Sequence, residues 1–230
     1  MNQKEWKYGL STPMVTIILT LISLVIVATV LSKTGGLIVP TEDSLAFKQE
    51  YESLNSKDNG YGGEYKNVFV YPANPMKYAT QEEVETLLTA GTGVIYFGFP
   101  ECPWCRNALD GFLDATWDLG TAEVLYFNNR DERDVVKLND DGSLVVEKEG
   151  TDGYKKILEL LGESASVYEG LNDENIKRLY YPTFVFVKDG KIVEFFEGTH
   201  PDVEEPAIAM TEAQQNELKE MFKDSFAKLK

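Results

Sequence analysis

A buried strand that leads directly into a helix is the feature of this chain that most restricts its fold. Residues 93–115 read GVIYFGFPECPWCRNALDGFLDA. The uncharged run at the start is typical of a strand buried in a sheet, and the residues after Cys102 repeat at helical spacing. The predicted buried face of that helix is Cys105, Leu109, Phe112, Leu113 and Thr116. A strand followed at once by a helix predicts an α/β fold in which the helix covers the sheet.

The segments around this junction continue the alternation. Residues 68–71 and 122–128 are short apolar runs that predict strands. The segment between 71 and 93 predicts a helix, because Thr80 and Glu83 form a capping-box pattern and a glycine ends it. The order strand, helix, strand, helix, strand predicts a sheet with parallel members and helices on its faces.

The C-terminal part of the chain predicts an antiparallel hairpin and a last helix. Residues 183–197 hold two alternating runs joined by the turn residues 188–191, which is a strong hairpin pattern. Residues 211–230 predict an amphipathic helix. Its apolar side consists of Leu218, Met221, Phe222, Phe226 and Leu229.

Residues 129–179 fit this alternation less well, and we interpret them as a partly helical insertion. They begin with either a hairpin that turns at Asp140–Gly142 or an irregular polar excursion. Residues 152–162 and 172–180 have helical periodicity.

The N-terminal segment predicts a transmembrane anchor. Residues 13–32 carry no charge, and about twenty apolar residues suffice to cross the ~30 Å hydrocarbon layer as a helix. A cleaved signal peptide is the alternative, but its apolar core would be shorter and its cleavage site clearer. Lys4 and Lys7 precede the span. The tail at 1–12 is therefore expected in the cytoplasm, and the rest outside a cell membrane that the chain crosses once.

The remaining chain is expected to form a stalk and one domain. Residues 33–62 are interpreted as a linker or stalk with a possible helix, and 63–230 as the folded domain. An extracytoplasmic position allows disulfides to persist, so even a single pair of cysteines is meaningful there.

The composition excludes several kinds of function. A net charge of −16 argues against nucleic acid as a partner. One histidine and two cysteines cannot supply the four ligands of a structural zinc site. A serine–histidine hydrolase would depend on His200, which lies in a polar loop without a nucleophile-elbow pattern. The cysteine pair is left as the candidate for chemistry.

The spacing and position of the two cysteines predict a redox pair. At the start of a helix, Cys102 would face unpaired backbone N–H groups, which favour its thiolate and lower its pKa below ~8.5. Cys102 would be the exposed nucleophile that attacks a substrate disulfide, and Cys105, one turn later, the buried resolving thiol. A static bridge is the alternative, but a loop this short constrains the unfolded chain little. No metal or separate cofactor is expected, because the reactive group is the Cys102–Cys105 disulfide itself.

Three neighbours of the pair are expected to affect it. Arg106 adds positive charge that favours the thiolate, whereas Glu101 directly precedes Cys102 and opposes it. Trp104 lies between the cysteines, where it is expected to be exposed and to contact a partner chain.

Two motifs together resemble the thioredoxin superfamily. They are VIYFGFPECPWCR and YYPTFVFVKDGKIVEFFEG, and a closing helix follows them. The chain is more closely similar to membrane-anchored bacterial thioredoxin-like proteins of the kind found as bacteriocin-transport accessory proteins. The resemblance covers about 63–128 and 178–229. It implies a central mixed sheet flanked by helices and a thiol–disulfide oxidoreductase of the cell envelope.

The resemblance also implies a substrate-binding loop opposite the cysteines. The bond between Tyr181 and Pro182 would be cis and would face the pair. The backbone of Tyr181 would bind the extended substrate chain, and Thr183 matches the usual residue after the proline. The implied partners are protein thiols or disulfides outside the membrane and a second protein that regenerates the redox pair.

The chain departs from this family in three places, which leaves the redox direction open. Tyr96 stands where thioredoxins carry a buried aspartate that accepts the proton of the resolving thiol. The dipeptide between the cysteines is Pro–Trp, and Asp110 lies where a helix-kinking proline is often found, although Gly111 beside it would still loosen the helix.

Two other functions are retained as alternatives. One is a non-catalytic partner-binding or transport-accessory module with a redox-sensitive clamp, and the other is a glutaredoxin-like enzyme, although only Gly198 follows the hairpin.

Overall fold

The computed structural model describes residues 16–23, 39–206 and 208–230, in two compact units that divide after Val39. In the first unit, residues 16–23 are helical. No helix within these described ranges is both long and apolar enough to cross a membrane. The predicted tail at 1–12 and all of the predicted anchor at 13–32 except 16–23 lie outside the described residues.

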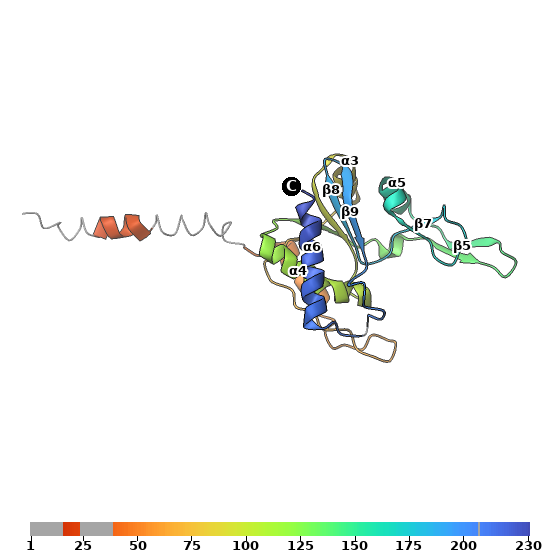
Figure 1. Ribbon diagram of the computed structural model, residues 1–230, viewed down its shortest axis with the longest axis horizontal. Helices are drawn as coiled ribbons and strands as arrows, with labels where there is room; N and C mark the ends of the chain where they lie inside the picture. Colours follow the sequence, from red (N-terminus) through yellow and green to blue (C-terminus); the bar gives the residue numbers. More distant parts are fainter. Residues whose placement is uncertain (1–15, 24–38, 207) are drawn as a thin grey trace, which may run out of the picture. The chain divides into compact units, whose positions relative to one another are not determined.

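The second unit is built on a central mixed sheet, which confirms the α/β class (Figure 1). Its strands follow the order β1-β3-β2-β8-β9. They are β1 (Met76–Tyr78), β3 (Val124–Phe127), β2 (Gly93–Phe97), β8 (Thr183–Lys188) and β9 (Lys191–Glu197). The first three are parallel, whereas β8 is antiparallel to β2 and β9 is antiparallel to β8. The predicted parallel part and the predicted β8–β9 hairpin are therefore both present.

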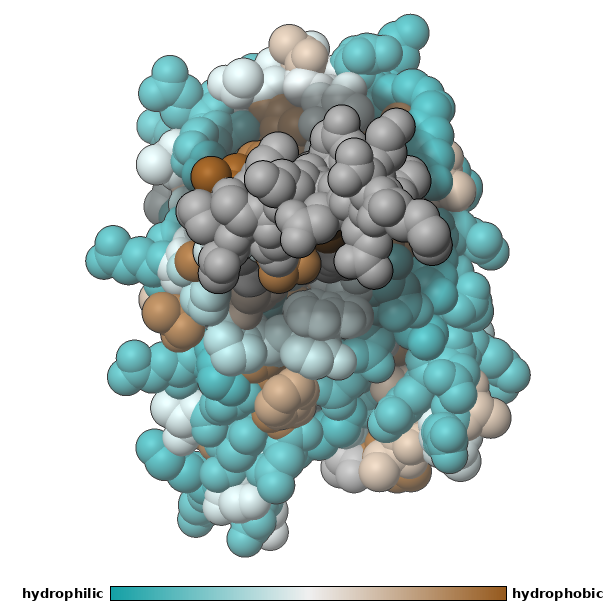
Figure 2. Space-filling view, turned by 90° about the vertical axis from the view of Figure 1, so that its left-hand side faces the viewer, coloured by the Kyte–Doolittle hydropathy of each residue, from teal (hydrophilic) through white to brown (hydrophobic). Residues whose placement is uncertain are grey.

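Helices cover both faces of the sheet. They are α2 (Glu42–Glu52), α3 (Gln81–Ala90), α4 (Pro103–Leu119), α5 (Asp152–Leu161) and α6 (Glu212–Ala227). One core cluster joins α2, α4 and α6 to the side chains of Tyr96 and Phe184. The other joins α3 and α5 to Ile95 and Val185. Because neighbouring residues of one strand point to opposite faces, β2 and β8 each serve both clusters. Polar residues cover most of the molecular face in Figure 2.

The predicted buried faces of α4 and α6 are confirmed. All five predicted positions of α4 are buried, and Leu218, Phe222 and Phe226 of α6 are buried against them. Gly111 permits this contact, since a Cβ there would lie 3.1 Å from the side chain of Leu218. The glycine therefore serves the close approach of α6, and α4 runs through it without a break.

Two predictions before β1 are wrong. The compact unit begins at Pro40 and not near 63, because Phe47 and Tyr51 of α2 lie fully buried in its core. Residues 68–71 form no strand. The side-chain amide of Asn55 hydrogen-bonds both the N–H and the carbonyl of Val68, at 3.0 and 2.9 Å. A side chain therefore satisfies the backbone groups that a neighbouring strand would bind in a sheet.

The insertion is less helical than predicted. A hairpin of β4 (Val135–Leu138) and β5 (Leu144–Lys148) turns at the predicted place and extends to one side of the sheet, and α5 follows it (Figure 1). The predicted helix at 172–180 is absent. The side chain of Asp173 instead accepts the N–H of Asn175 in a turn, and a short strand follows. The remaining short elements are η1 (Arg130–Glu132), η2 (Gly162–Ser164), β6 (Ser166–Val167) and β7 (Lys177–Arg178), with β6 and β7 paired.

Candidate active site at the cysteine pair

Cys102 is the N-cap residue of α4. Its sulfur accepts the backbone N–H of Cys105 at 3.1 Å, one of the donors that a helix leaves unpaired at its start. Pro103 occupies the first helical position, where a missing N–H costs nothing. The local sequence therefore both begins the helix and places the sulfur over its amino end. Both cysteines are free thiols.

The surroundings of Cys102 lower its pKa. The largest cause is a hydrogen bond from the Cys105 thiol, and burial opposes it. The backbone N–H groups of Cys105 and Trp104 and the positive charge of Arg133 lower the pKa further. The backbone N–H groups at the helix start thus act in the predicted direction, but the Cys105 thiol lowers the pKa of Cys102 more than they do.

Cys105 is shifted the other way. It is fully buried, and burial raises its pKa well above the ordinary value, as do the hydrogen bond to Cys102 and the charge of that sulfur. Hydrogen bonds from the Phe99 backbone and from the Tyr96 hydroxyl partly oppose the shift. One thiol of the pair is therefore prepared to ionise while the other is held protonated.

Cys102 is not exposed, contrary to the prediction. Only 5% of its surface is accessible, and its thiol donates to the carbonyl oxygen of Tyr181 at 3.7 Å. Cys102 borders a cleft that Phe99, Pro103 and Arg130 also line. Trp104, also predicted to be exposed, is half-buried and packs against the core cluster that holds both cysteines.

The loop opposite the cysteines has the predicted backbone. The bond between Tyr181 and Pro182 is cis. The Tyr181 ring lies inward, and its hydroxyl donates to Asn129 Oδ1 at 2.5 Å. The Thr183 side chain is fully buried and donates to the carbonyl of Tyr180 at 2.7 Å. Only the backbone of this loop thus lies at the sulfur, whereas the side chain of Thr183 supports the loop.

Neither predicted charge acts on Cys102 as expected. Arg106 is fully buried and donates to the carbonyls of Lys66, Tyr51 and Pro100 and to the Asn55 side chain. Glu101 is exposed and pairs with Arg130 at 3.2 Å. Arg106 is therefore a structural link between segments of the chain. The negative charge of Glu101 is opposed by the positive charge of Arg130.

Arg133 is a candidate site residue that the sequence did not reveal, because its charge lowers the pKa of Cys102. Its guanidinium lies over the Tyr181 ring at 4.6 Å and donates to the carbonyl of Leu179 at 3.4 Å. Its Nε is buried without a hydrogen-bond partner among the described residues. Arg133 belongs to the irregular insertion, where no periodic pattern marks a residue that reaches back to the cysteines.

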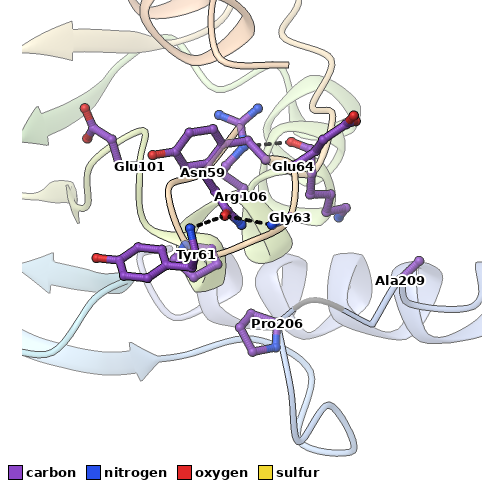
Figure 3. Close-up of a pocket in the computed structure, with 11 residues that line it drawn as sticks. Asn59, Tyr61, Gly63, Glu64, Glu101, Arg106, Pro206 and Ala209 are labelled. Atoms are coloured by element: carbon purple, nitrogen blue, oxygen red, sulfur yellow. Dashed lines mark hydrogen bonds between the residues drawn. The ribbon is translucent and has the colours of Figure 1, made fainter. Parts of the chain in front are cut away.

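Two adjoining clefts lie beside Cys102. The first has a volume of 620 Å³ and is bordered by the 59–66 loop and by Pro206 and Ala209 (Figure 3). The Asn59 side-chain oxygen holds that loop, since it accepts the N–H of Tyr61 at 2.8 Å (Figure 3). The second cleft, also of 620 Å³, shares part of this wall. It is lined by Asn59, Gly60, Tyr61, Tyr65, Phe99, Glu101, Cys102, Pro103 and Arg130.

Comparison of the chain with protein-family models, with curated proteins and with solved structures gave no match. Across residues 16–23, 39–206 and 208–230, no three His, Cys, Asp or Glu side chains are grouped so as to hold a metal ion. What the site can do must therefore be derived from the two thiols and their surroundings.

Proposed function

We propose that the chain is a thiol–disulfide oxidoreductase with a thioredoxin-like fold, tethered on the outer side of the cell membrane by residues 13–32. One observation carries the proposal. The Cys102 sulfur accepts a helix N–H at 3.1 Å and lies 3.7 Å from the Tyr181 carbonyl, next to a cis proline. A thiol with a lowered pKa and a backbone carbonyl next to a cis proline therefore lie side by side.

The opposite pKa shifts of the two thiols support a two-step exchange. The Cys102 thiolate attacks a protein disulfide, which forms a mixed disulfide and releases the first substrate thiolate. Cys105, once deprotonated, attacks the Cys102 sulfur, so that the internal disulfide forms and the second substrate thiolate leaves. The reverse sequence transfers the disulfide to a substrate dithiol. A second redox protein outside the membrane restores the starting form.

The substrate is proposed to bind as an extended chain along the Tyr181 backbone. That backbone lies beside the sulfur, and Trp104 offers a half-buried apolar surface next to it. A cleft joins Cys102 to Phe99, Tyr65 and Tyr61, the last of which is 93% exposed. Aromatic side chains beside a reactive thiol suit an apolar segment of a partner protein.

A non-catalytic partner-binding module is the second candidate, and the burial of Cys102 favours it. With 5% of its surface accessible, the thiol presents little surface to an attacking disulfide, although it borders the cleft lined by Phe99 and Pro103. In such a module the cysteine pair would only alter the loop when it is oxidised.

Trapping of mixed disulfides distinguishes the two candidates. The Cys105→Ser variant of the full chain is produced in membranes, and its adducts are separated without reductant and identified by mass spectrometry. An oxidoreductase accumulates adducts with several proteins through Cys102, and the Cys102→Ser/Cys105→Ser double variant accumulates none. If the single variant traps no protein and does not react with oxidised glutathione, the enzymatic proposal fails and the binding module stands.

A further inference from the structure

An aromatic cluster is exposed beside the C-terminal end of α4. The rings of Tyr71 and Trp117 stack at 4.8 Å, and the Phe69 ring meets that of Tyr71 edge to face at 5.1 Å. Trp117 is 50% exposed, and Phe69 is 60% exposed. Large apolar side chains that gather on the surface of a charged protein mark an interaction site. We call Phe69, Tyr71 and Trp117 the aromatic face.

The aromatic face adjoins the start of the second unit. In the first turn of α2, the Ser44 hydroxyl donates to the Pro72 carbonyl at 2.8 Å. The Asn74 side-chain amide donates to the carbonyls of Ser44 and Tyr71, both at 2.8 Å. The extended segment of the aromatic face is therefore fixed to the first turn of α2, close to where the chain enters the unit.

Leu45 and Lys48 continue the aromatic face along α2. The Lys48 ammonium lies 5.2 Å from the centre of the Phe69 ring. Leu45 is 48% exposed and precedes Lys48 by three residues, which places both on the same side of the helix. Apolar surface therefore extends from Trp117 through Phe69 to Leu45.

The chain leaves little length between this face and the apolar segment 13–32. Only residues 33–39 separate that segment from Pro40, where the second unit begins. Even when fully extended, seven residues span at most about 25 Å. If residues 13–32 cross a membrane as proposed above, the start of α2 and the adjoining aromatic face must stay near the membrane surface.

We propose that the aromatic face lies in the interfacial layer of the membrane that anchors the chain. The inference rests on the tether in the proposed function and adds a second contact with the lipid. Tyrosine and tryptophan suit this layer, because each combines an apolar ring with one polar group. The aromatic face presents both residues on the side of the unit where the chain arrives from the tether.

The charged groups that border the face have partners. Asp114 accepts a tyrosine hydroxyl of the face at 3.0 Å, and Asp118 pairs with Lys223 at 2.8 Å. Lys48 pairs with Glu52 at 2.5 Å. The net charge of the chain is −16, so anionic lipid does not attract it. The apolar area of the face must therefore supply the binding.

This contact sets the orientation of the redox pair. Cys102 caps the first end of α4, and Trp117 lies near its last residue, about 22 Å away at a rise of 1.5 Å per residue. With the aromatic face in the lipid interface, α4 acts as a spacer that holds Cys102 up to that distance from the lipid. The substrates are then cysteines of polypeptide segments that stand clear of the membrane surface.

Quenching by brominated lipid tests the contact. The full chain with Trp6→Phe and Trp104→Phe is reconstituted into phosphatidylcholine vesicles, so that Trp117 is its only tryptophan. Bromine on acyl carbons next to the headgroups should remove most of the Trp117 fluorescence, and bromine at the ends of the acyl chains should remove little. Phe69→Glu, at an exposed position, adds a charge to the face and should abolish this quenching.

The matched control carries Tyr61→Trp and Trp117→Phe in the same background. Tyr61 is 93% exposed and lines the cleft at the Cys102 end of α4, so brominated lipid should leave the fluorescence of this variant unchanged. Equal quenching in both variants overturns the inference. So does unquenched Trp117 in chains that float with the vesicles, and emission that then shifts with chain density would assign the face to a second copy. Chains that do not float with the vesicles lack the tether, which overturns that part of the proposed function and the inference with it.

Discussion

Cys102 and Cys105 are one helical turn apart, yet their pKa values are shifted in opposite directions. The difference arises from the hydrogen bonds that each sulfur accepts and from its burial. Cys102 receives hydrogen bonds from the Cys105 thiol and from backbone N–H groups, whereas burial dominates at Cys105. In the proposed oxidoreductase, this difference within a single turn of helix would make Cys102 the nucleophile and Cys105 the resolving thiol.

Arg133 is expected to tune the nucleophile. Replacing it with Gln removes a charge that lowers the pKa of Cys102, so the thiolate fraction below neutral pH falls. A single half-exposed charge is worth about 0.5–1 kcal/mol, so alkylation of Cys102 by iodoacetamide near pH 6 should slow about two- to fivefold. The rate is measured against pH, and its midpoint should move to higher pH.

Lys137→Gln is the matched control for this measurement. Lys137 pairs with Glu147 at 2.7 Å and lies in the same insertion. Its loss should leave the alkylation midpoint in place. Equal slowing in both variants would mean that the general charge of the insertion, and not Arg133, acts on Cys102.

Among the elements, α4 and α2 are joined by Arg106. This guanidinium donates to the carbonyl of Tyr51 at the end of α2 and to that of Pro100 in the loop before Cys102, at 2.9 and 3.2 Å. It also bonds Lys66 and Asn55, at 2.7 and 2.6 Å. Arg106 therefore fixes the loop that carries the cysteines, and its guanidinium is occupied by backbone carbonyls and the Asn55 side chain.

Arg106→Met should destabilise the fold without changing the thiol. The substitution leaves several buried acceptors unpaired, which costs about 3 kcal/mol or more in the free energy of unfolding. Denaturant unfolding measures that loss, and the alkylation midpoint of Cys102 should stay unchanged. Arg130→Met, which breaks only surface pairs, should cost less than about 1 kcal/mol. If the alkylation midpoint of Cys102 shifts while the free energy of unfolding is unchanged, Arg106 modulates the thiol as the sequence analysis expected.

The sequence predicts elements whose residues interact with near neighbours in the chain. Thr80 and Glu83 cap α3 as expected, since the capping box spans four residues. The prediction fails where the partner is distant. Val68 lies in an apolar run that resembles a strand, but the side chain of Asn55 satisfies its backbone. No local pattern marks such a pairing.

The candidate site likewise has a local part that the sequence predicts and a part from distant segments that it does not. The cysteine pair and its helix start are local, and both were predictable. Tyr96 was recognised only as the absence of an aspartate, because its partner Tyr51 is 45 positions away and belongs to a segment interpreted as a stalk. Arg133 reaches the site from an insertion without a regular pattern. The parts of the site contributed by distant segments required the structure.

At the scale of the whole second unit, buried tyrosines make its stability depend on alkaline pH. Tyr51, Tyr96, Tyr126 and Tyr154 are at most 1% exposed. Burial is the largest cause that raises the pKa of each phenol. In the unfolded chain the same groups ionise near pH ~10. Above that pH the folded state holds more protons than the unfolded state, so stability must fall as pH rises.

These four groups set a minimum for the expected slope, because the pKa values of Tyr78, Tyr181 and Cys105 are raised as well. Once the unfolded tyrosines are ionised, each retained proton contributes about 1.4 kcal/mol per pH unit, so the free energy of unfolding should fall by at least about 5 kcal/mol per unit. Denaturant unfolding of the reduced chain across this range measures the slope, and tyrosinate absorbance should rise together with unfolding. Tyr126→Phe should reduce the slope by about 1.4 kcal/mol per unit, and Tyr61→Phe, at an exposed position, serves as the control. Tyrosinate absorbance that appears well before unfolding would show that these hydroxyls reach solvent, which would contradict their burial in the core.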